Sequence, residues 1–149
     1  MDVLSPMSPG DKKIILIVDD DRDNLDLIRE QVSLLIDCSV VTALDGNTAL
    51  SLAKKLHPNL ILLDIWLPGL DGFQVVQHLK QDPQTGAIPV IAVTAAARFQ
   101  EQAIAMQVGF VDYICKPYDL ETLEVAIAKC LAHSLPMATN EVTGGCHCN

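Results

Sequence analysis

Acidic residues follow two apolar segments of the chain. The run Asp19–Asp21 comes directly after segment 14–18, and Asp64 comes directly after segment 60–63. Carboxylates held within a few ångströms of one another cannot all remain ionised without compensation, because like charges raise one another's pKa. A divalent cation supplies that compensation, and carboxylates without a neighbouring His or Cys suit Mg2+ better than zinc. If the fold brings the two segments together, these residues predict a magnesium site.

Two residue types that act on phosphate also follow apolar segments. Thr94 follows a β-rich segment, and Lys116 follows another and precedes Pro117, which restricts the turn. A hydroxyl, a point cation and Mg2+ can together neutralise the oxygens of a phosphoryl group, and charge stabilisation is most of what phosphoryl transfer requires of a protein. The pattern therefore predicts a site that can stabilise a phosphoryl group. The structural alternatives are an ordinary strand threonine and a solvated surface lysine.

The apolar segments alternate with stretches of helical spacing, which indicates βα units in series. Several segments are apolar without alternation, so both of their faces are expected to be buried, as in a parallel sheet covered by helices. Right-handed crossovers then give a five-stranded, doubly wound α/β sheet, because a barrel requires eight such units. Ligands bind such sheets at the carboxyl ends of the strands. The expected strands are 14–18, 39–42, 60–63, 89–93 and 111–115, and the expected helices are 25–35, 49–56, 73–80, 99–108 and 120–132.

The bulk properties favour one folded domain and argue against two classes of partner. A chain of 149 residues fits one ordinary domain, expected at 12–133, between a flexible extension at 1–11 and a flexible tail at 134–149. The net charge of −9 argues against direct nucleic-acid binding, which draws on clustered Lys and Arg. The apolar segments are far shorter than the ~20 residues that a membrane-spanning helix needs.

The N-terminus and the cysteines predict a cytoplasmic protein. Residues 1–10 lack the basic and apolar progression of a secretory signal. The five cysteines, an odd number, lie mostly among apolar neighbours, which favours reduced thiols over a disulfide framework. The closing Cys146, His147 and Cys148 are soft metal ligands, but a closed zinc site needs four from a held geometry. We therefore expect a tail exposed for partner contact or one without function.

Four motifs occur in order along the chain, in segments 14–21, 60–72, 93–95 and 115–117. Thirty residues separate Asp64 from Thr94, and twenty-two separate Thr94 from Lys116. In sequence and spacing these motifs resemble those of response-regulator receiver domains, the CheY-like superfamily, in the stand-alone single-domain form. The resemblance covers about residues 12–133. It implies a flavodoxin-like fold with strand order 2-1-3-4-5.

The resemblance implies a role for each acidic residue. Asp64 would accept a phosphoryl group from a phosphohistidine on a histidine kinase or a histidine phosphotransfer protein. Asp19, Asp20 and Asp64, together with the backbone carbonyl of Trp66, would hold Mg2+. The chemistry would then be limited to self-phosphorylation from a donor and slow autodephosphorylation, so the chain would not be an enzyme acting on an external substrate.

The resemblance also implies how a signal leaves the site. Thr94 and Lys116 would bind the phosphoryl oxygens, and the Lys116–Pro117 peptide bond would be cis. The added charge would draw Thr94 inward and Tyr113 would rotate inward with it. The fourth helix, fifth strand and fifth helix would then bind a downstream protein. For Tyr113, the alternative is an ordinary strand aromatic with a solvated hydroxyl.

Two positions that flank the path of the attacking water in this family carry apolar residues here. Trp66 lies two residues after Asp64, and Ala96 lies two residues after Thr94. Bulk and apolarity hinder a water molecule without helping to orient it. We therefore expect slow hydrolysis of the acyl phosphate.

Other interpretations of the acidic residues make different demands on the sequence. Asp19–Asp21 can cap the following helix, an interpretation that we adopt for Asp21. Phosphatases of the haloacid-dehalogenase type resemble a pattern with a second Asp two residues after the nucleophile, where this chain has Trp66. A flavin-binding module needs a phosphate-binding loop after the first strand, and the acidic residues there would repel a phosphate. A receiver-like module that binds partners independently of phosphate is the alternative function.

Overall fold

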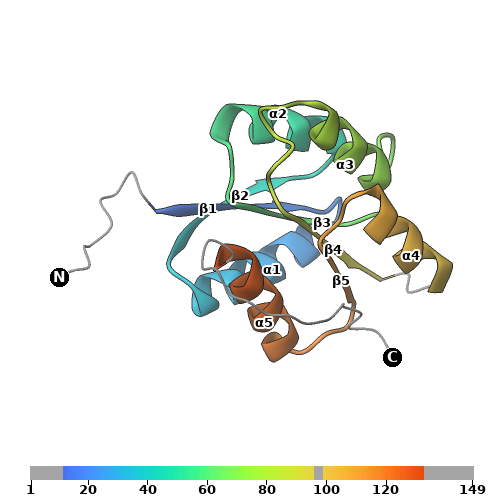
Figure 1. The fold of residues 1–149 in the computed structure, drawn as a ribbon. Coiled ribbons are helices and arrows are strands. Elements are labelled where there is room, and N and C mark those ends of the chain that lie inside the picture. Colours follow the sequence, from blue (N-terminus) through green and yellow to red (C-terminus); the bar gives the residue numbers. More distant parts are fainter. Residues whose placement is uncertain (1–11, 96–98, 133–149) are drawn as a thin grey trace.

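The sheet that the sequence predicts is present in the computed structural model, which describes residues 12–95 and 99–132. Its five parallel strands lie in the order β2-β1-β3-β4-β5 (Figure 1), which confirms the doubly wound α/β fold and the expected strand order. Each strand begins and ends within one residue of its expected position. The strands are β1 (Lys13–Val18), β2 (Cys38–Ala43), β3 (Leu60–Leu63), β4 (Val90–Thr94) and β5 (Asp112–Cys115). The expected extension, the expected tail and Ala96 lie outside the described residues.

Helices cover both faces of the sheet. In Figure 1, α1 and α5 lie on one face, and α2, α3 and α4 lie on the other. The first two helices begin three residues earlier than expected, because their first turns are polar and carry no apolar spacing. The helices are α1 (Arg22–Leu35), α2 (Gly46–Leu56), α3 (Gly72–Gln81), α4 (Phe99–Val108) and α5 (Leu120–Leu131).

The apolar strands divide their side chains between two cores. Because successive strand residues point to opposite faces, Ile15 and Ile17 pack under α1 and α5, whereas Leu16 and Val18 pack under α2 and α3. All residues of β3 and β4 are buried. Burial of each large apolar side chain stabilises the fold by about 1.5–3 kcal/mol. This two-sided burial explains why the central strands show no alternation in sequence.

Aspartates begin four of the helices. Asp21, Asp45, Asp71 and Asp119 each accept a backbone N–H from the first turn of α1, α2, α3 and α5, respectively. The Gln74 side chain also accepts the Asp71 backbone N–H, which completes a capping box. Each cap stabilises its helix by about 1 kcal/mol. Asp21 is therefore a helix cap, as expected.

One cysteine contradicts the expected redox state. Cys115, at the end of β5, takes part in a disulfide bond, so the prediction of reduced thiols is wrong for this residue. Cys38 and Cys130 are reduced thiols. Burial raises the pKa of Cys130 to about 11. Counting cysteines cannot identify a single bridge, because pairing depends on which chain segments meet in space.

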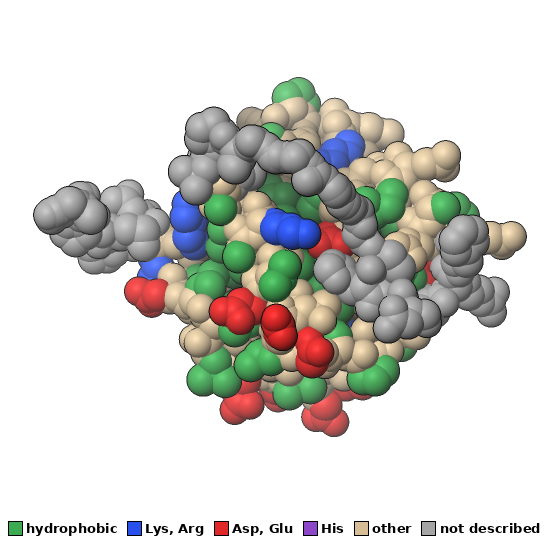
Figure 2. Space-filling view, turned by 60° about the horizontal axis from the view of Figure 1, so that its bottom comes forward, with side chains coloured by type: hydrophobic (Ala, Val, Ile, Leu, Met, Phe, Trp, Pro, Cys, Tyr) green, Lys and Arg blue, Asp and Glu red, His purple; other side chains and the backbone are tan. Residues whose placement is uncertain are grey.

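The surface of α1 and α5 is acidic. Figure 2 shows Asp and Glu side chains gathered on this face, where the exposed acidic residues are Asp23, Asp26, Glu30, Glu121 and Glu124. Such a surface repels a phosphate backbone, in line with the overall charge of −9. Among the helices of residues 12–95 and 99–132, none is long and apolar enough to span a membrane.

Candidate functional site

Three carboxylates meet at the carboxyl edge of the sheet. Strands β1 and β3 are paired so that Val18 lies beside Leu63, which places the next residues, Asp19 and Asp64, side by side. One oxygen each of Asp19, Asp20 and Asp64 lies within 4.8 Å of the others. Asp19 is buried, Asp64 is half-buried and Asp20 is exposed. The fold therefore brings together the two acidic segments that the sequence singled out.

Lys116 is the cation of this cluster. Its Nζ lies 2.7 Å from Asp19 Oδ2 and 3.8 Å from Asp64 Oδ2. Strand β5 delivers it there, because Cys115 pairs with Thr94 and the Lys116 backbone N–H donates to the Thr94 carbonyl. The Lys116–Pro117 peptide bond is cis, as the sequence resemblance implied. One lysine offsets part of the charge of three carboxylates, and the remainder suits a divalent cation.

The Asp64 carboxyl group has a raised pKa. Burial is the main cause, and the neighbouring charge of Asp19 adds to it. The Lys116 ammonium, the Trp66 backbone N–H and the Thr94 hydroxyl oppose the rise. The Trp66 N–H donates to Asp64 Oδ1 at 3.1 Å. Removal of water around Asp64 therefore outweighs its favourable contacts.

The Thr94 hydroxyl is buried beside this carboxylate without a completed hydrogen bond. Thr94 is fully buried at the end of β4, and its Oγ1 is the only buried side-chain polar atom of the described residues that lacks a hydrogen-bond partner. An unsatisfied buried hydroxyl costs about 1–3 kcal/mol. Its position, close enough to influence the Asp64 pKa, suits a donor to an oxygen bound at Asp64.

Tyr113 already points inward in this structure. Its side chain is fully buried, and its hydroxyl donates to Glu101 Oε1 on α4. The solvated hydroxyl of the alternative interpretation is therefore wrong. In this buried position the Glu101 carboxylate is the partner of the Tyr113 hydroxyl, and the coupling of Tyr113 to movement of Thr94 stays a prediction.

Glu101 was not identified from the sequence. Its side chain is buried, and Oε2 accepts the Trp66 indole N–H at 2.8 Å. The sequence carries a signal, because Glu101 lies four residues before Ala105 and therefore on the same face of the helix. In the structure Ala105 is buried. That spacing places Glu101 on the inner face of α4, where a charged residue needs a partner.

The donor set of the cluster fits Mg2+. Three carboxylates from two adjacent strand ends, with no His or Cys among them, match the oxygen ligands of a hard divalent cation. Asp20 is exposed and gives access from solvent. The backbone carbonyl of Trp66 stays a predicted ligand.

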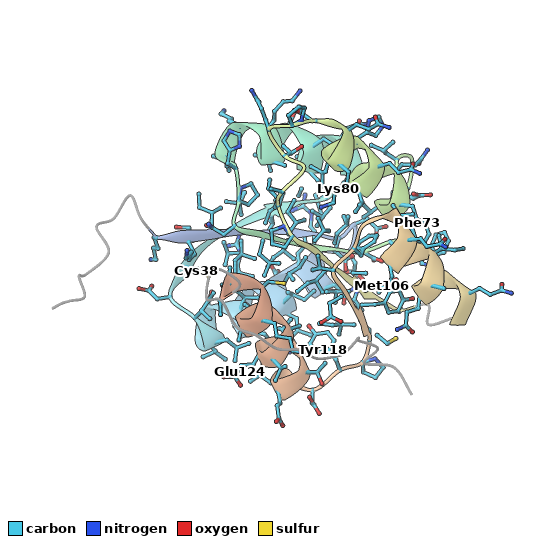
Figure 3. The ribbon with its side chains drawn as sticks, in the orientation of Figure 1. Cys38, Phe73, Lys80, Met106, Tyr118 and Glu124 are labelled. Atoms are coloured by element: carbon cyan, nitrogen blue, oxygen red, sulfur yellow. The ribbon has the colours of Figure 1, made fainter. Side chains whose placement is uncertain are left out.

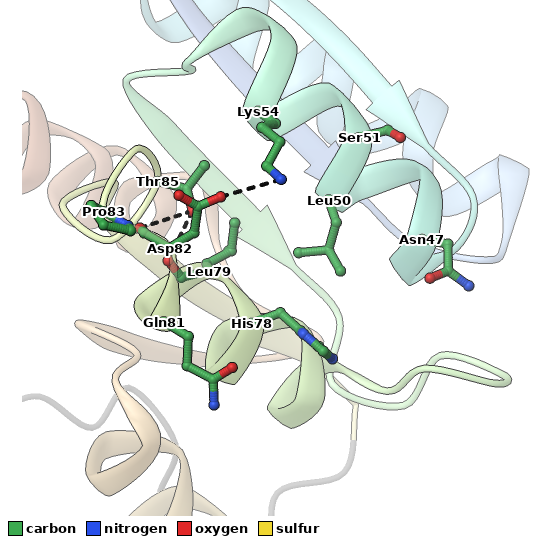
Figure 4. Close-up of a pocket in the computed structure, with 10 residues that line it drawn as sticks. All are labelled: Asn47, Leu50, Ser51, Lys54, His78, Leu79, Gln81, Asp82, Pro83 and Thr85. Carbon is green, nitrogen blue, oxygen red and sulfur yellow. Dashed lines mark hydrogen bonds and ion pairs between the residues drawn. The ribbon is translucent and has the colours of Figure 1, made fainter.

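A large groove lies away from this cluster. It has a volume of about 680 Å3 and lies between α2, α3 and the turn after α3 (Figure 4). Lys54 Nζ, 3.4 Å from Asp82 Oδ2, bridges the two sides of this groove. None of Asp19, Asp20, Asp64, Thr94 and Lys116 lines it. The candidate site is therefore identified by the chemistry of its side chains and not by the volume of a groove.

A doubly wound sheet with three carboxylates, a threonine and a cis-Pro lysine at its carboxyl edge defines the receiver class of signalling domains. Residues 15–128 match the family described as the response regulator receiver domain. The chain therefore belongs to this family and is a receiver domain of two-component signalling.

Similar proteins include regulators and a small protein of comparable length. The chain is 39% identical over 109 residues to the DNA-binding dual master transcriptional regulator RpaA of Synechocystis sp., covering 73% of this chain and 45% of that protein. It is 38% identical over 120 residues to a 14.6 kDa protein from the sodA1 3' region of Leptolyngbya boryana, covering 79% and 90%. Chemotaxis protein CheY4 of Vibrio cholerae has a TM-score of 0.74 at 25% identity, covering 80% of this chain and 99% of that one. The chain spans about half the length of RpaA and of the ycf27 regulators that it matches.

Proposed function

We propose that Asp64 is the phosphoacceptor of a two-component phosphorelay. The observation that carries this proposal is the unpartnered, buried Thr94 hydroxyl at the site of Asp64, where Lys116 Nζ lies 3.8 Å from Asp64 Oδ2. A hydroxyl donor and a cation near a carboxylate, next to further acidic groups, form a receptor for a phosphoryl group. The donor is a phosphohistidine of a histidine kinase or of a histidine phosphotransfer protein.

The transfer balances without any further reactant. An Asp64 carboxylate oxygen attacks phosphorus and the bond from phosphorus to the histidine nitrogen breaks. The histidine leaves as a neutral imidazole, because its other ring nitrogen already carries a proton in the protonated phosphohistidine. Lys116 turns from Asp64 to a phosphoryl oxygen, and Thr94 donates its hydroxyl to another. Asp19, Asp20, Asp64 and the Trp66 carbonyl would hold Mg2+, which would supply charge neutralisation for the phosphoryl oxygens.

The output of this switch is protein contact. Phosphorylation replaces the single negative charge of the Asp64 carboxylate with the roughly two charges of a phosphoryl group, which biases the surface of α4, β5 and α5 toward a downstream protein. The acidic surface of α1 and α5 disfavours direct contact between this domain and nucleic acid. Turnover of an external phosphate ester is not part of this function, and hydrolysis of the acyl phosphate is slow.

The test uses acetyl phosphate with Mg2+. We expect intact-mass analysis to show one added phosphoryl group on the wild-type chain and none on Asp64→Asn. Absence of modification on the wild type would overturn the proposal. Small phosphate esters separate a switch from a phosphatase, because a switch is labelled once and a phosphatase turns over. Partners captured equally with and without a beryllium fluoride mimic would favour a phosphate-independent binding module.

A further inference from the structure

A buried carboxylate on α4 connects the acceptor loop with β5. Glu101 uses both of its oxygens: Oε2 accepts the Trp66 indole N–H at 2.8 Å, and Oε1 accepts the Tyr113 hydroxyl. Only about 6% of Glu101 is exposed. A buried carboxylate with two donors is held in one position, because losing either donor leaves it unsatisfied.

The Trp66 end of this connection reaches the phosphoacceptor. The Trp66 backbone N–H donates to Asp64 Oδ1, so the backbone contacts the acceptor while the indole contacts Glu101. The indole ring also packs edge to face on Phe73, with ring centroids 6.1 Å apart. Figure 3 places Phe73 on α3, near α4. Trp66 is nevertheless 51% exposed, so burial alone does not fix its ring.

The Tyr113 end of this connection reaches the output surface. Tyr113 lies on β5 and pairs with Ala92 of β4, two residues before Thr94. Its ring is fully buried, and its hydroxyl donates to Glu101 Oε1. The three side chains come from the β3–α3 loop, α4 and β5, which are the elements between the acceptor and the proposed output face.

We propose that Glu101 is a positioning residue for the phosphoacceptor site. It holds the Trp66 indole beside Asp64, which restricts water at the acyl phosphate, and it holds Tyr113 inward. The inference rests on the proposed phosphorylation of Asp64 and adds a regulatory link to it. Events at Asp64 reach α4 through the Trp66 contact, and the Tyr113 contact passes them to β5.

The lifetime of the phosphoryl group tests the first part of this link. We expect Glu101→Ala to speed dephosphorylation by about tenfold, the factor that corresponds to one hydrogen bond's net effect on a barrier. Glu101→Gln keeps a carbonyl acceptor for the indole and should stay closer to the wild-type rate. Glu30→Ala is the matched control, because it replaces a glutamate at an exposed position on α1, outside the proposed output surface.

A second parent variant, Trp66→Phe, distinguishes a positioning role of Glu101 from a general loss of stability in Glu101→Ala. In Trp66→Phe the contact with Glu101 is already absent, so adding Glu101→Ala should leave the dephosphorylation rate unchanged. A structural defect would instead speed dephosphorylation in both backgrounds, and that outcome would overturn the inference.

Fluorescence tests the link directly, because the chain contains one tryptophan. Beryllium fluoride with Mg2+ should change Trp66 emission in the wild type, in Glu101→Gln and in Glu30→Ala, and Glu101→Ala should lose most of that change. If every variant is modified at Asp64 and Glu101→Ala behaves like the wild type in lifetime and emission, the role of Glu101 is refuted. If no variant is modified, the proposed function itself fails.

Discussion

At the scale of single residues, the partial burial of Asp64 opposes the ionisation of its carboxyl group. Its pKa is raised above 3.8, mainly by burial, so ionisation of the carboxyl group is less favourable in the folded state than in the unfolded state. Ionised Asp64 therefore lowers the stability of the metal-free fold. This loss of unfolding free energy is absent below the unfolded-state pKa and reaches its full size as the pH rises through the folded-state pKa.

We predict that Asp64→Asn is more stable than the wild type at neutral pH without Mg2+. Asn removes the charge and keeps an oxygen that can accept the Trp66 N–H. The gain should shrink toward zero as the pH falls below 3.8, the ordinary pKa of the Asp64 carboxyl. Urea unfolding of both proteins across a pH series measures this gain in unfolding free energy. A gain that does not vary with pH would contradict this explanation.

Trp66 is the second residue with a testable role. Its only side-chain polar atom, the indole N–H, is bonded to Glu101 and is not free to orient water at Asp64. We predict that Trp66→Asn speeds dephosphorylation by about tenfold or more, because it removes bulk and adds a polar group. Trp66→Ala removes only the bulk and should give a smaller increase. An unchanged rate in Trp66→Asn would end the argument for slow hydrolysis.

At the scale of elements, the start of α3 holds the acceptor loop in place. A Cβ on Gly72 would lie 2.6 Å from Ile65 Cα and 2.8 Å from the Asp64 carbonyl oxygen. Both atoms are backbone, so the loop itself would have to shift. We predict that Gly72→Ala lowers the unfolding free energy by about 1–3 kcal/mol and slows phosphorylation. Gly86→Ala, where the nearest contact is 3.3 Å, is the comparison and should leave the phosphorylation rate unchanged.

The end of α2 offers a stabilising change far from the site. His57 closes this helix with φ 49°, in the left-handed region that residues with a Cβ adopt at a cost. It is exposed, so its side chain contributes little packing. We predict that His57→Gly raises the unfolding free energy by about 1 kcal/mol. His57→Ala keeps the Cβ and should show no gain in the same unfolding assay.

At the scale of the whole molecule, the charge of −9 makes stability depend on ions. Mg2+ that binds only the folded state should stabilise it by about 1.4 kcal/mol at ten times its dissociation constant. Screening by any salt also stabilises an acidic chain, so NaCl at equal ionic strength is the control. We predict a magnesium-specific rise in the unfolding midpoint that Asp20→Asn, a change at the exposed member of the cluster, reduces strongly. Equal effects of the two salts would argue against a magnesium site.

The sequence by itself determined the fold and the positions of the reactive groups. Strand segments such as Leu60–Leu63 are apolar on both faces, and this local pattern is enough to predict a buried parallel sheet. Once the strands are parallel, residues that follow them, such as Asp19 and Asp64, must meet at one edge. Both inferences need only periodicity and chain direction, which are properties of sequence.

Only the tertiary structure decided which side chains meet beyond that edge. The inward position of Tyr113 and its contact with Glu101 depend on how α4 packs beside β5. The Trp66 contact depends on the loop that Gly72 allows to approach α3. The disulfide at Cys115 likewise depends on distance in space. Contacts of this kind are selected by packing and rotamer choice among residues far apart in the chain, and no local pattern encodes them.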